Sequence, residues 1–245
     1  MMLKQAWWLA RKELQPSKYS IALNMLFYLY AAAVILSMSV ELGDANAPGG
    51  TRPFTGIVLN LFVMAILPNL GFLISRRYMT YRTTDLFTKK LAFMRQLPIP
   101  LRVIVSSRFM QLLITLVPMA LVLFACYGIV AAALHLVSFG ALQFAGFFLF
   151  WIGYSLVFGS LYVYWELGLT GRQYFNRCMM MVPVYMVAAV VLWLWLGESV
   201  WTRSLSWVED SYGGISLLSL LVAALTVLGV GKALVARLRQ RDLHG

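Results

Sequence analysis

The sequence predicts an all-α integral membrane protein with six transmembrane helices, and three observations lead to this fold class. The 245 residues are 61% hydrophobic, and their mean hydropathy is +0.79. Only 12% of them are charged, against about 25% in soluble proteins, so there is too little polar surface for a water-soluble fold. The apolar residues fall in long uniform runs without alternation, which favours membrane helices over membrane strands.

Six of these runs are long enough to cross the hydrocarbon, which takes about 20 residues of α-helix. Together they make residues 1–245 a single transmembrane domain. The predicted spans are Ser20–Val40, Phe54–Ser75, Phe109–Leu134, Leu142–Tyr164, Met179–Leu196 and Ile215–Leu234.

The distribution of basic residues predicts that both termini are cytoplasmic. With this orientation, 18 of the 20 Lys and Arg residues lie in cytoplasmic segments, and only Arg52 and Arg203 lie outside. Cytoplasmic loops of membrane proteins carry this excess of basic residues. The net charge of +11 is therefore interpreted as a topology signal that also attracts anionic lipid headgroups, and no nucleic-acid partner is expected.

The N-terminal segment, residues 2–15, predicts an amphipathic helix in the cytoplasmic interface, with a disordered tail as the alternative. Its apolar residues recur at helical spacing, and Pro16 would end the helix. The apolar face is predicted to consist of Leu3, Trp7, Ala10 and Leu14.

The cytoplasmic segment between the second and third spans, residues 76–108, predicts a helix that a soluble partner binds. Asp85 is a candidate N-cap for a helix Leu86–Leu97, which Pro98 and Pro100 would end before a second short helix begins at about Leu101. A solvated loop that only sets the topology is the alternative. The residues expected to contact the partner are Asp85, Leu86, Phe87, Lys89, Lys90, Leu91, Phe93 and Arg95.

Two further expectations concern the segment after the fourth span and the polar residues inside the spans. Residues Trp165–Cys178 are predicted to form a loop with a second partner contact, and Trp165 and Trp201 are predicted to lie at the membrane interfaces. The polar residues of the spans are expected to form interhelical hydrogen bonds and are the candidates for a substrate pathway. They are Asn24, Asn60, Asn69 and Gln111.

Enzyme motifs are missing from the sequence. Two histidines and two cysteines without CxxC spacing cannot assemble a zinc site or a histidine-based catalytic site. The segment Gly229–Ala233 lacks the first glycine and the final Ser or Thr of a phosphate-binding loop. The chain is therefore expected to be non-catalytic and to bind no metal or cofactor of its own.

The order of these elements resembles the permease subunits of bacterial ATP-binding-cassette type-2 exporters. The resemblance covers the architecture of the whole chain, and its sequence motif is the segment Leu86–Arg108 with Leu97-Pro98-Ile99 before the third span. It implies a bacterial cytoplasmic-membrane permease dimer, formed with itself or a sister subunit, and separate cytoplasmic ATPase subunits that bind ATP and Mg²⁺.

In such an exporter, the helix Asp85–Leu97 would be the coupling helix and residues 2–15 the elbow helix. The missing large outer domain favours a drug, a peptide or a lipid-like molecule as the substrate. An intramembrane enzyme and a secondary transporter or channel that works without ATP remain the alternatives. An enzyme would need paired acids or histidines near the spans, and a secondary transporter would be expected to show an inverted repeat.

The topology can be tested by labelling single cysteines in a variant whose two native cysteines are replaced by serine. Cysteines at Asp44, His135 and Gly213 should react with a membrane-impermeant maleimide on intact cells, because these positions are predicted to be external. Cysteines at Thr84 and Gln240 should react only after the membrane is permeabilised. Labelling at Thr84 in intact cells would overturn the orientation.

Overall fold

The computed structural model describes residues 2–14, 18–43, 51–73, 85–97, 99–134 and 140–240. Every regular element in these ranges is a helix, and six of them are long and apolar enough to cross a membrane. The chain is thus a multi-pass membrane protein, as the sequence predicts. The six candidate spans are α2 (Lys18–Gly43), α3 (Thr51–Ile66) extended by the 3₁₀ helix η2 (Leu67–Gly71), α7 (Leu101–Ala133), α8 (Ala141–Gly168), α9 (Gly171–Leu196) and α11 (Gly214–Gln240).

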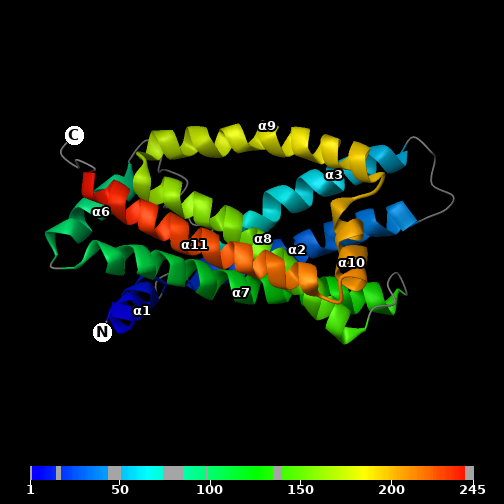
Figure 1. The fold of residues 1–245 in the computed structure, drawn as a ribbon, viewed down its shortest axis with the longest axis horizontal. Coiled ribbons are helices and arrows are strands. Elements are labelled where there is room, and N and C mark those ends of the chain that lie inside the picture. Colours follow the sequence, from blue (N-terminus) through cyan, green and yellow to red (C-terminus); the bar gives the residue numbers. More distant parts are fainter. Residues whose placement is uncertain are drawn as a thin grey trace.

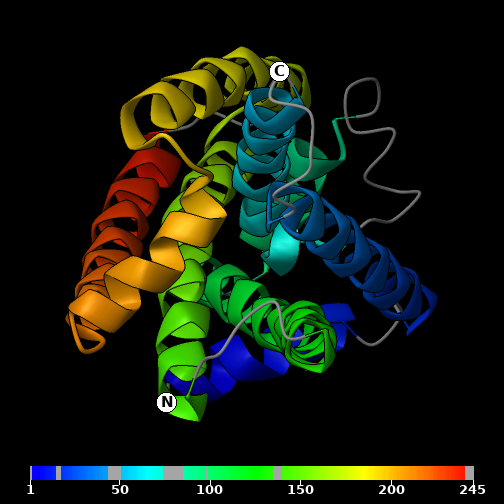
Figure 2. The same ribbon diagram turned by 90° about the vertical axis from the view of Figure 1, so that its right-hand side faces the viewer.

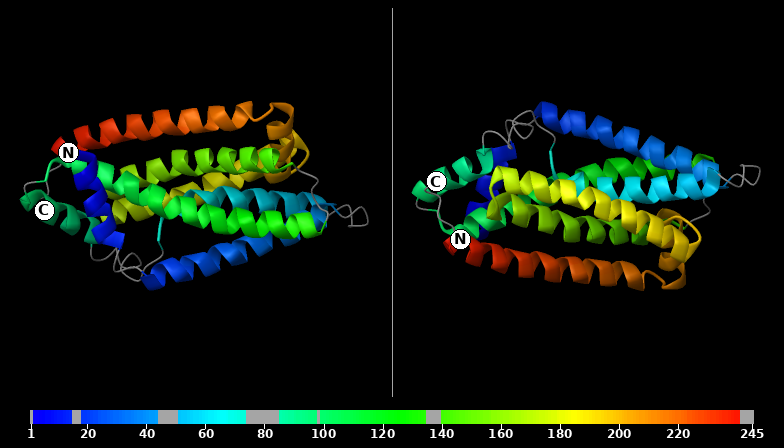
Figure 3. Two further views of the ribbon diagram at one scale, coloured as in Figure 1. Left: turned by 90° about the horizontal axis from the view of Figure 1, so that it is seen from below. Right: turned by 90° about the horizontal axis from the view of Figure 1, so that it is seen from above.

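The spans run along the long axis of the molecule, and three shorter features mark its ends (Figure 1). Helices α1 (Met2–Leu14) and α6 (Leu86–Gln96) lie at the same end as the C-terminal part of α11. Helix α10 (Val200–Asp210) lies at the opposite end. Seen from below, α1 crosses α7 at a steep angle to the spans (Figure 3).

Helix α8 is the centre of the bundle. It contacts α7, α9, α10, α11 and η2, and the view along the long axis shows α2, α9 and α11 at the periphery (Figure 2). Ser216 and Ser219 of α11 donate hydrogen bonds to the carbonyls of Gly146 and Phe150 on α8, at 2.7 and 2.9 Å. Such close backbone approach requires small residues where membrane helices meet.

The second span changes from α to 3₁₀ geometry at Leu67, because Pro68 has no N–H with which to continue the α-helical ladder. The carbonyl of Met64, which residue 68 would otherwise bond, accepts a hydrogen bond from the Tyr154 hydroxyl of α8 at 3.0 Å. The carbonyl of Gly71 accepts one from Thr115 of α7 at 2.6 Å. The irregular end of the span is therefore joined to the two central helices.

Three sequence predictions need correction. Helix α7 runs without interruption from Leu101, so no separate short helix precedes the third span; Pro100 occupies its N-cap position and nothing after it breaks the helix. The segment Trp165–Cys178 is not a loop, because α8 continues to Gly168 and α9 begins at Gly171 behind the capping residue Thr170. Helix α10 was not predicted.

Helix α10 also explains why Trp201 is not an interface residue. Ser199 caps the helix by accepting from the N–H of Thr202 at 3.1 Å, and the side chains at helical spacing behind it, Trp201, Ser204 and Val208, are buried. The Trp201 ring is 1% exposed and packs with its centroid 4.7 Å from that of Phe147. Burial in an aromatic core has replaced the expected contact with lipid headgroups.

A substitution at Gly153 tests the close packing of α8 against α11. A Cβ added there would lie 2.1 Å from Ser219 Oγ and 2.8 Å from the Ser219 backbone carbonyl, so the helices must separate. Gly153→Ala should lower the free energy of unfolding by about 1–3 kcal/mol, measured by thermal unfolding of the purified protein in detergent.

The matched control is Gly229→Ala on α11, where an added Cβ meets nothing within 4 Å. This variant should be neutral, or more stable by about 0.4–1 kcal/mol, because alanine reduces the freedom of the unfolded chain. Equal melting temperatures for the two variants would contradict the described contact.

Candidate functional site

Helix α6 packs against the end of the bundle through Leu91 and exposes other side chains. Leu91 is 1% exposed and belongs to an apolar cluster with Ile104, Val105 and Phe109 of α7. Phe93 is 62% exposed, and Lys89 is exposed as well. The side chains of Leu86, Phe87 and Arg95 lie outside the described part of the structure, as do residues 76–84 of the predicted cytoplasmic segment.

The prediction that the Asp85 side chain caps its own helix, α6, is wrong. Asp85 does stand at the N-cap position of α6, but it adopts a left-handed conformation with φ of 42°, and its side chain does not accept from its own helix. Its Oδ1 accepts instead from the N–H of Gly171 at 2.8 Å, at the start of α9. Asp85 therefore connects α6 to the junction of α8 and α9, a tertiary contact that a cap pattern in the sequence does not reveal.

A second polar contact joins α6 to α1. Lys90 Nζ lies 2.7 Å from Glu13 Oε2, and the Lys90 side chain is 45% exposed while that of Glu13 is 19% exposed. The same Glu13 oxygen accepts from Gln111 Nε2 of α7 at 2.6 Å. Glu13 thus links the two short helices to the third span.

A buried ion pair continues this network from α7 to α8. Arg108 donates from Nε and Nη2 to the same oxygen, Glu166 Oε2, at 2.9 and 2.6 Å, and from Nη1 to Gln111 Oε1 at 2.9 Å. The side chains of Arg108 and Glu166 are 12% and 5% exposed. The guanidinium carbon also lies 5.3 Å from the centre of the Phe72 ring, which follows η2.

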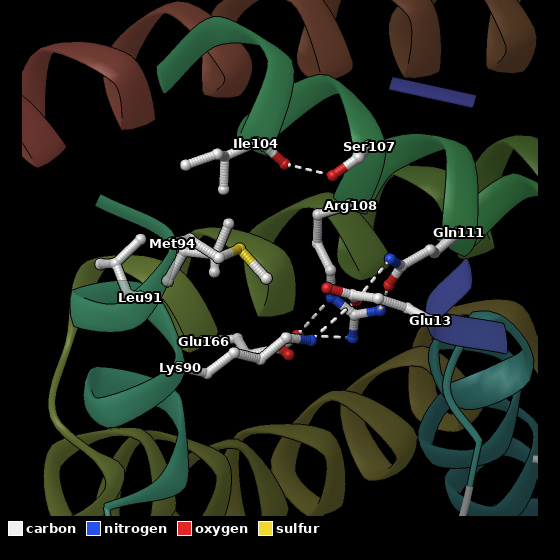
Figure 4. Close-up of a pocket in the computed structure, with 10 residues that line it drawn as sticks. Glu13, Lys90, Leu91, Met94, Ile104, Ser107, Arg108, Gln111 and Glu166 are labelled. Atoms are coloured by element: carbon white, nitrogen blue, oxygen red, sulfur yellow. Dashed lines mark hydrogen bonds and ion pairs between the residues drawn. The ribbon is translucent and has the colours of Figure 1, made fainter. Parts of the chain in front are cut away.

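These side chains form a continuous chain of polar contacts, the coupling network, defined by Lys90, Glu13, Gln111, Arg108 and Glu166. Figure 4 shows that all five converge on one small cavity of about 20 Å³. The network carries two positive and two negative groups, so its charges balance within the protein. It joins α6, α1, α7 and α8.

Part of the predicted apolar face of helix α1 packs against the protein, and the other part is exposed. Ala10 is buried together with Ala6 against α7, and Leu14 is half-buried. Leu3 and Trp7 are 70% and 52% exposed. The small alanines allow α1 to approach α7 closely enough for Glu13 to reach Gln111.

The four candidate pathway residues do not gather in one place. Gln111 belongs to the coupling network, whereas Asn60 bonds between helices: its Oδ1 accepts from the N–H of Val200 at 2.7 Å, and its Nδ2 donates to Ala189 O at 3.3 Å. Asn24 and Asn69 each donate to a carbonyl four residues earlier in their own span. The expectation of interhelical bonding is thus met by Asn60 and Gln111.

Sequence reasoning singled out Lys90, Leu91 and Gln111 but missed Glu13, Arg108 and Glu166 as site residues. One signal was present in the sequence: Glu166 is an acidic residue next to an apolar run, and Arg108 lies at the start of another. A charged residue at the edge of a span usually has a partner of opposite charge.

Comparisons with protein-family models, curated proteins and solved structures give no match to this chain. Within the described ranges, no group of three or more His, Cys, Asp or Glu side chains is arranged to hold a metal ion. The functional argument therefore rests on the arrangement of α1, α6 and the coupling network.

The two ion pairs of the network should contribute very differently to stability. Arg108→Ala leaves Glu166 charged and buried without its partner, which should cost about 3–5 kcal/mol of unfolding free energy. Lys90→Ala removes a half-exposed pair and should cost about 0–1 kcal/mol. Denaturant or thermal unfolding of the purified variants measures both values.

The exposed pair of Arg203 and Glu198, whose side chains are 44% and 38% exposed, is the control at the far end of the molecule. Arg203→Ala should match Lys90→Ala in unfolding free energy. If Arg108→Ala were no more destabilised than these two variants, the buried ion pair would not be holding α7 to α8.

Proposed function

We propose that the chain is the permease subunit of an exporter in the bacterial cytoplasmic membrane, driven by ATPase subunits on separate chains. The observation that carries this proposal is the double character of α6. One face is attached to the bundle through Leu91, Lys90 and Asp85, while Phe93 and Lys89 point away from it. An exposed aromatic ring on a firmly attached helix supports a role as the docking surface for a soluble partner.

The connection between α6 and the spans supports energy coupling in particular. A helix that only fixed topology would need basic residues and no link to the membrane helices. Here α6 is connected to α1 by Glu13, and to the α8–α9 junction by Gly171. In the proposed cycle, closure of the ATPases moves α6, and the coupling network passes this movement to α7 and α8.

Orientation and assembly follow from the same proposal. The end that carries α1 and α6 faces the cytoplasm, and Leu3, Trp7 and Trp8 of α1 rest in the lipid interface beside its basic residues. Helices α9 and α11 present mostly exposed apolar side chains, and these faces are covered by lipid and by a second permease. The substrate is a drug, a peptide or a lipid-like molecule.

The alternative of an intramembrane enzyme has less support. Glu166 is the more deeply buried of the two acidic residues of the network, and Arg108 engages it with two donors. With its Oε2 atom engaged by both donors, this carboxylate serves as an ion-pair partner within the bundle.

The double change Phe87→Ala and Phe93→Ala tests the docking surface. Each truncated ring should cost about 1–4 kcal/mol of binding free energy, because interface energy concentrates in aromatic anchors. The variant should insert into the membrane as wild type does, but it should no longer copurify with an ATPase or export. Mass spectrometry of the complex isolated from its native host measures the ATPase content.

Leu142→Ala is the control, since Leu142 is 87% exposed at the start of α8, far from α6. It should retain the ATPase. The proposal fails if the double variant retains a stoichiometric ATPase and exports normally, or if the wild-type permease isolated without any ATPase hydrolyses ATP.

A further inference from the structure

Helix α8 carries a row of aromatic side chains on one face. Tyr154, Phe158, Tyr162 and Trp165 follow one another at intervals of three or four residues, which places them along one side of the helix. The ring centroids of Tyr154 and Phe158 are 4.7 Å apart, and those of Tyr162 and Trp165 are 5.6 Å apart. These distances are typical of aromatic pairs in contact.

Tyr185 of α9 completes this row from the opposite helix. Its hydroxyl lies 3.0 Å from that of Tyr162, and its ring centroid lies 6.0 Å from that of Phe158. Tyr162 and Tyr185 are 6% and 4% exposed, so both are buried within the protein. We call the set of Tyr154, Phe158, Tyr162, Trp165 and Tyr185 the aromatic seam.

The rest of α9 is anchored elsewhere. In its second half, the carbonyl of Ala189 accepts from Asn60 of α3, and the ring of Trp193 occupies the space beside Gly56 of the same helix. At its start, Gly171 is bonded to Asp85. Between these anchors, Pro183 cannot donate to the carbonyl of residue 179, which weakens the helix two residues before Tyr185.

We propose that the aromatic seam is the binding site for an amphipathic molecule with a planar aromatic ring system. The rings of Phe158 and Tyr185 can exchange their contact with each other for contact with a ligand ring, so little attraction is lost when the seam opens. The two tyrosine hydroxyls, released from their mutual bond, then meet a hydroxyl or carbonyl group of the ligand. This inference rests on the proposed permease function and narrows its substrate class.

The coupling network lies close to the end of the aromatic seam that contains Tyr162 and Trp165. The ring of Phe72 lies 6.0 Å from that of Tyr162 and 5.3 Å from the guanidinium carbon of Arg108. Glu166, the partner of Arg108, directly follows Trp165 in α8. A movement of α7 and α8 at this ion pair therefore changes the surroundings of two seam residues, and this would connect the ATPase surface to the substrate site.

Equilibrium binding of daunorubicin to the full chain in lipid nanodiscs, without ATPase or ATP, tests the seam. Daunorubicin is a fluorescent planar ring system that carries hydroxyl and carbonyl groups. Fluorescence anisotropy should show saturable binding above that of empty nanodiscs. Phe158→Leu keeps an apolar side chain but removes the ring, and it should raise Kd about tenfold.

Two further variants separate ring stacking from general effects. Tyr185→Phe keeps the ring and should keep Kd within about threefold of the wild-type value. Trp195→Leu removes an equally aromatic side chain from α9, but one that is 77% exposed outside the seam, and it should leave Kd unchanged. Melting temperatures of all three variants verify the fold. If Phe158→Leu does not fold, Tyr185→Leu, which removes the ring, is compared with Tyr185→Phe, which keeps it, and equal Kd values for these two variants would overturn ring stacking.

Three results would overturn the proposal: no saturable binding to the wild-type chain, an equal loss of affinity in Trp195→Leu and Phe158→Leu, or displacement of daunorubicin by n-dodecanol, which would indicate a groove for acyl chains. Because no ATPase is present, the outcome is independent of the docking experiment. If the chain binds daunorubicin normally but never copurifies with an ATPase, the proposed exporter function is refuted and the proposed binding site is not.

Discussion

The structure depends first on the rule that a backbone polar group in hydrocarbon must find its partner within the protein. Uninterrupted helices satisfy this rule by themselves, and the places where a helix is interrupted decide how the spans are joined. At Pro68 the ladder loses a donor, and the Tyr154 hydroxyl replaces it at the carbonyl of Met64. One missing N–H thus ties the second span to α8, and it positions the first residue of the aromatic seam.

Features that depend on local composition could be predicted from the sequence, and features that depend on helix phase could not. The six spans follow from the length and apolarity of their runs, and neither property depends on how the helices pack against one another. Trp201 was misplaced because a tryptophan is equally compatible with an interface and with an aromatic core. The spacing of Trp201, Ser204 and Val208 behind the cap at Ser199 would have predicted the buried face of α10.

The candidate site divides in the same way. The helical character of residues 86–96 could be anticipated from local pattern, whereas the packing of Leu91 against α7 could not. The partners of its polar residues could not, since Lys90 meets Glu13 across 77 residues and Arg108 meets Glu166 across 58. Asp85 shows why: the same carboxylate that would cap its own helix bonds to Gly171, and only the approach of α9 decides between the two.

The two ion pairs of the coupling network differ in burial, and they should therefore respond differently in the proposed cycle. The pair of Lys90 and Glu13 is partly solvated, so it breaks and reforms at little cost, whereas separating Arg108 from Glu166 leaves buried charges unpaired. In the proposed cycle, the outer pair therefore adjusts as α6 moves, and the buried pair keeps α7 and α8 moving as one unit. Between α8 and α9, the described contacts beyond their shared turn include the hydrogen bond of Tyr162 with Tyr185. In the proposed cycle, movement that enters at α6 therefore changes the contact between α8 and α9 at the aromatic seam.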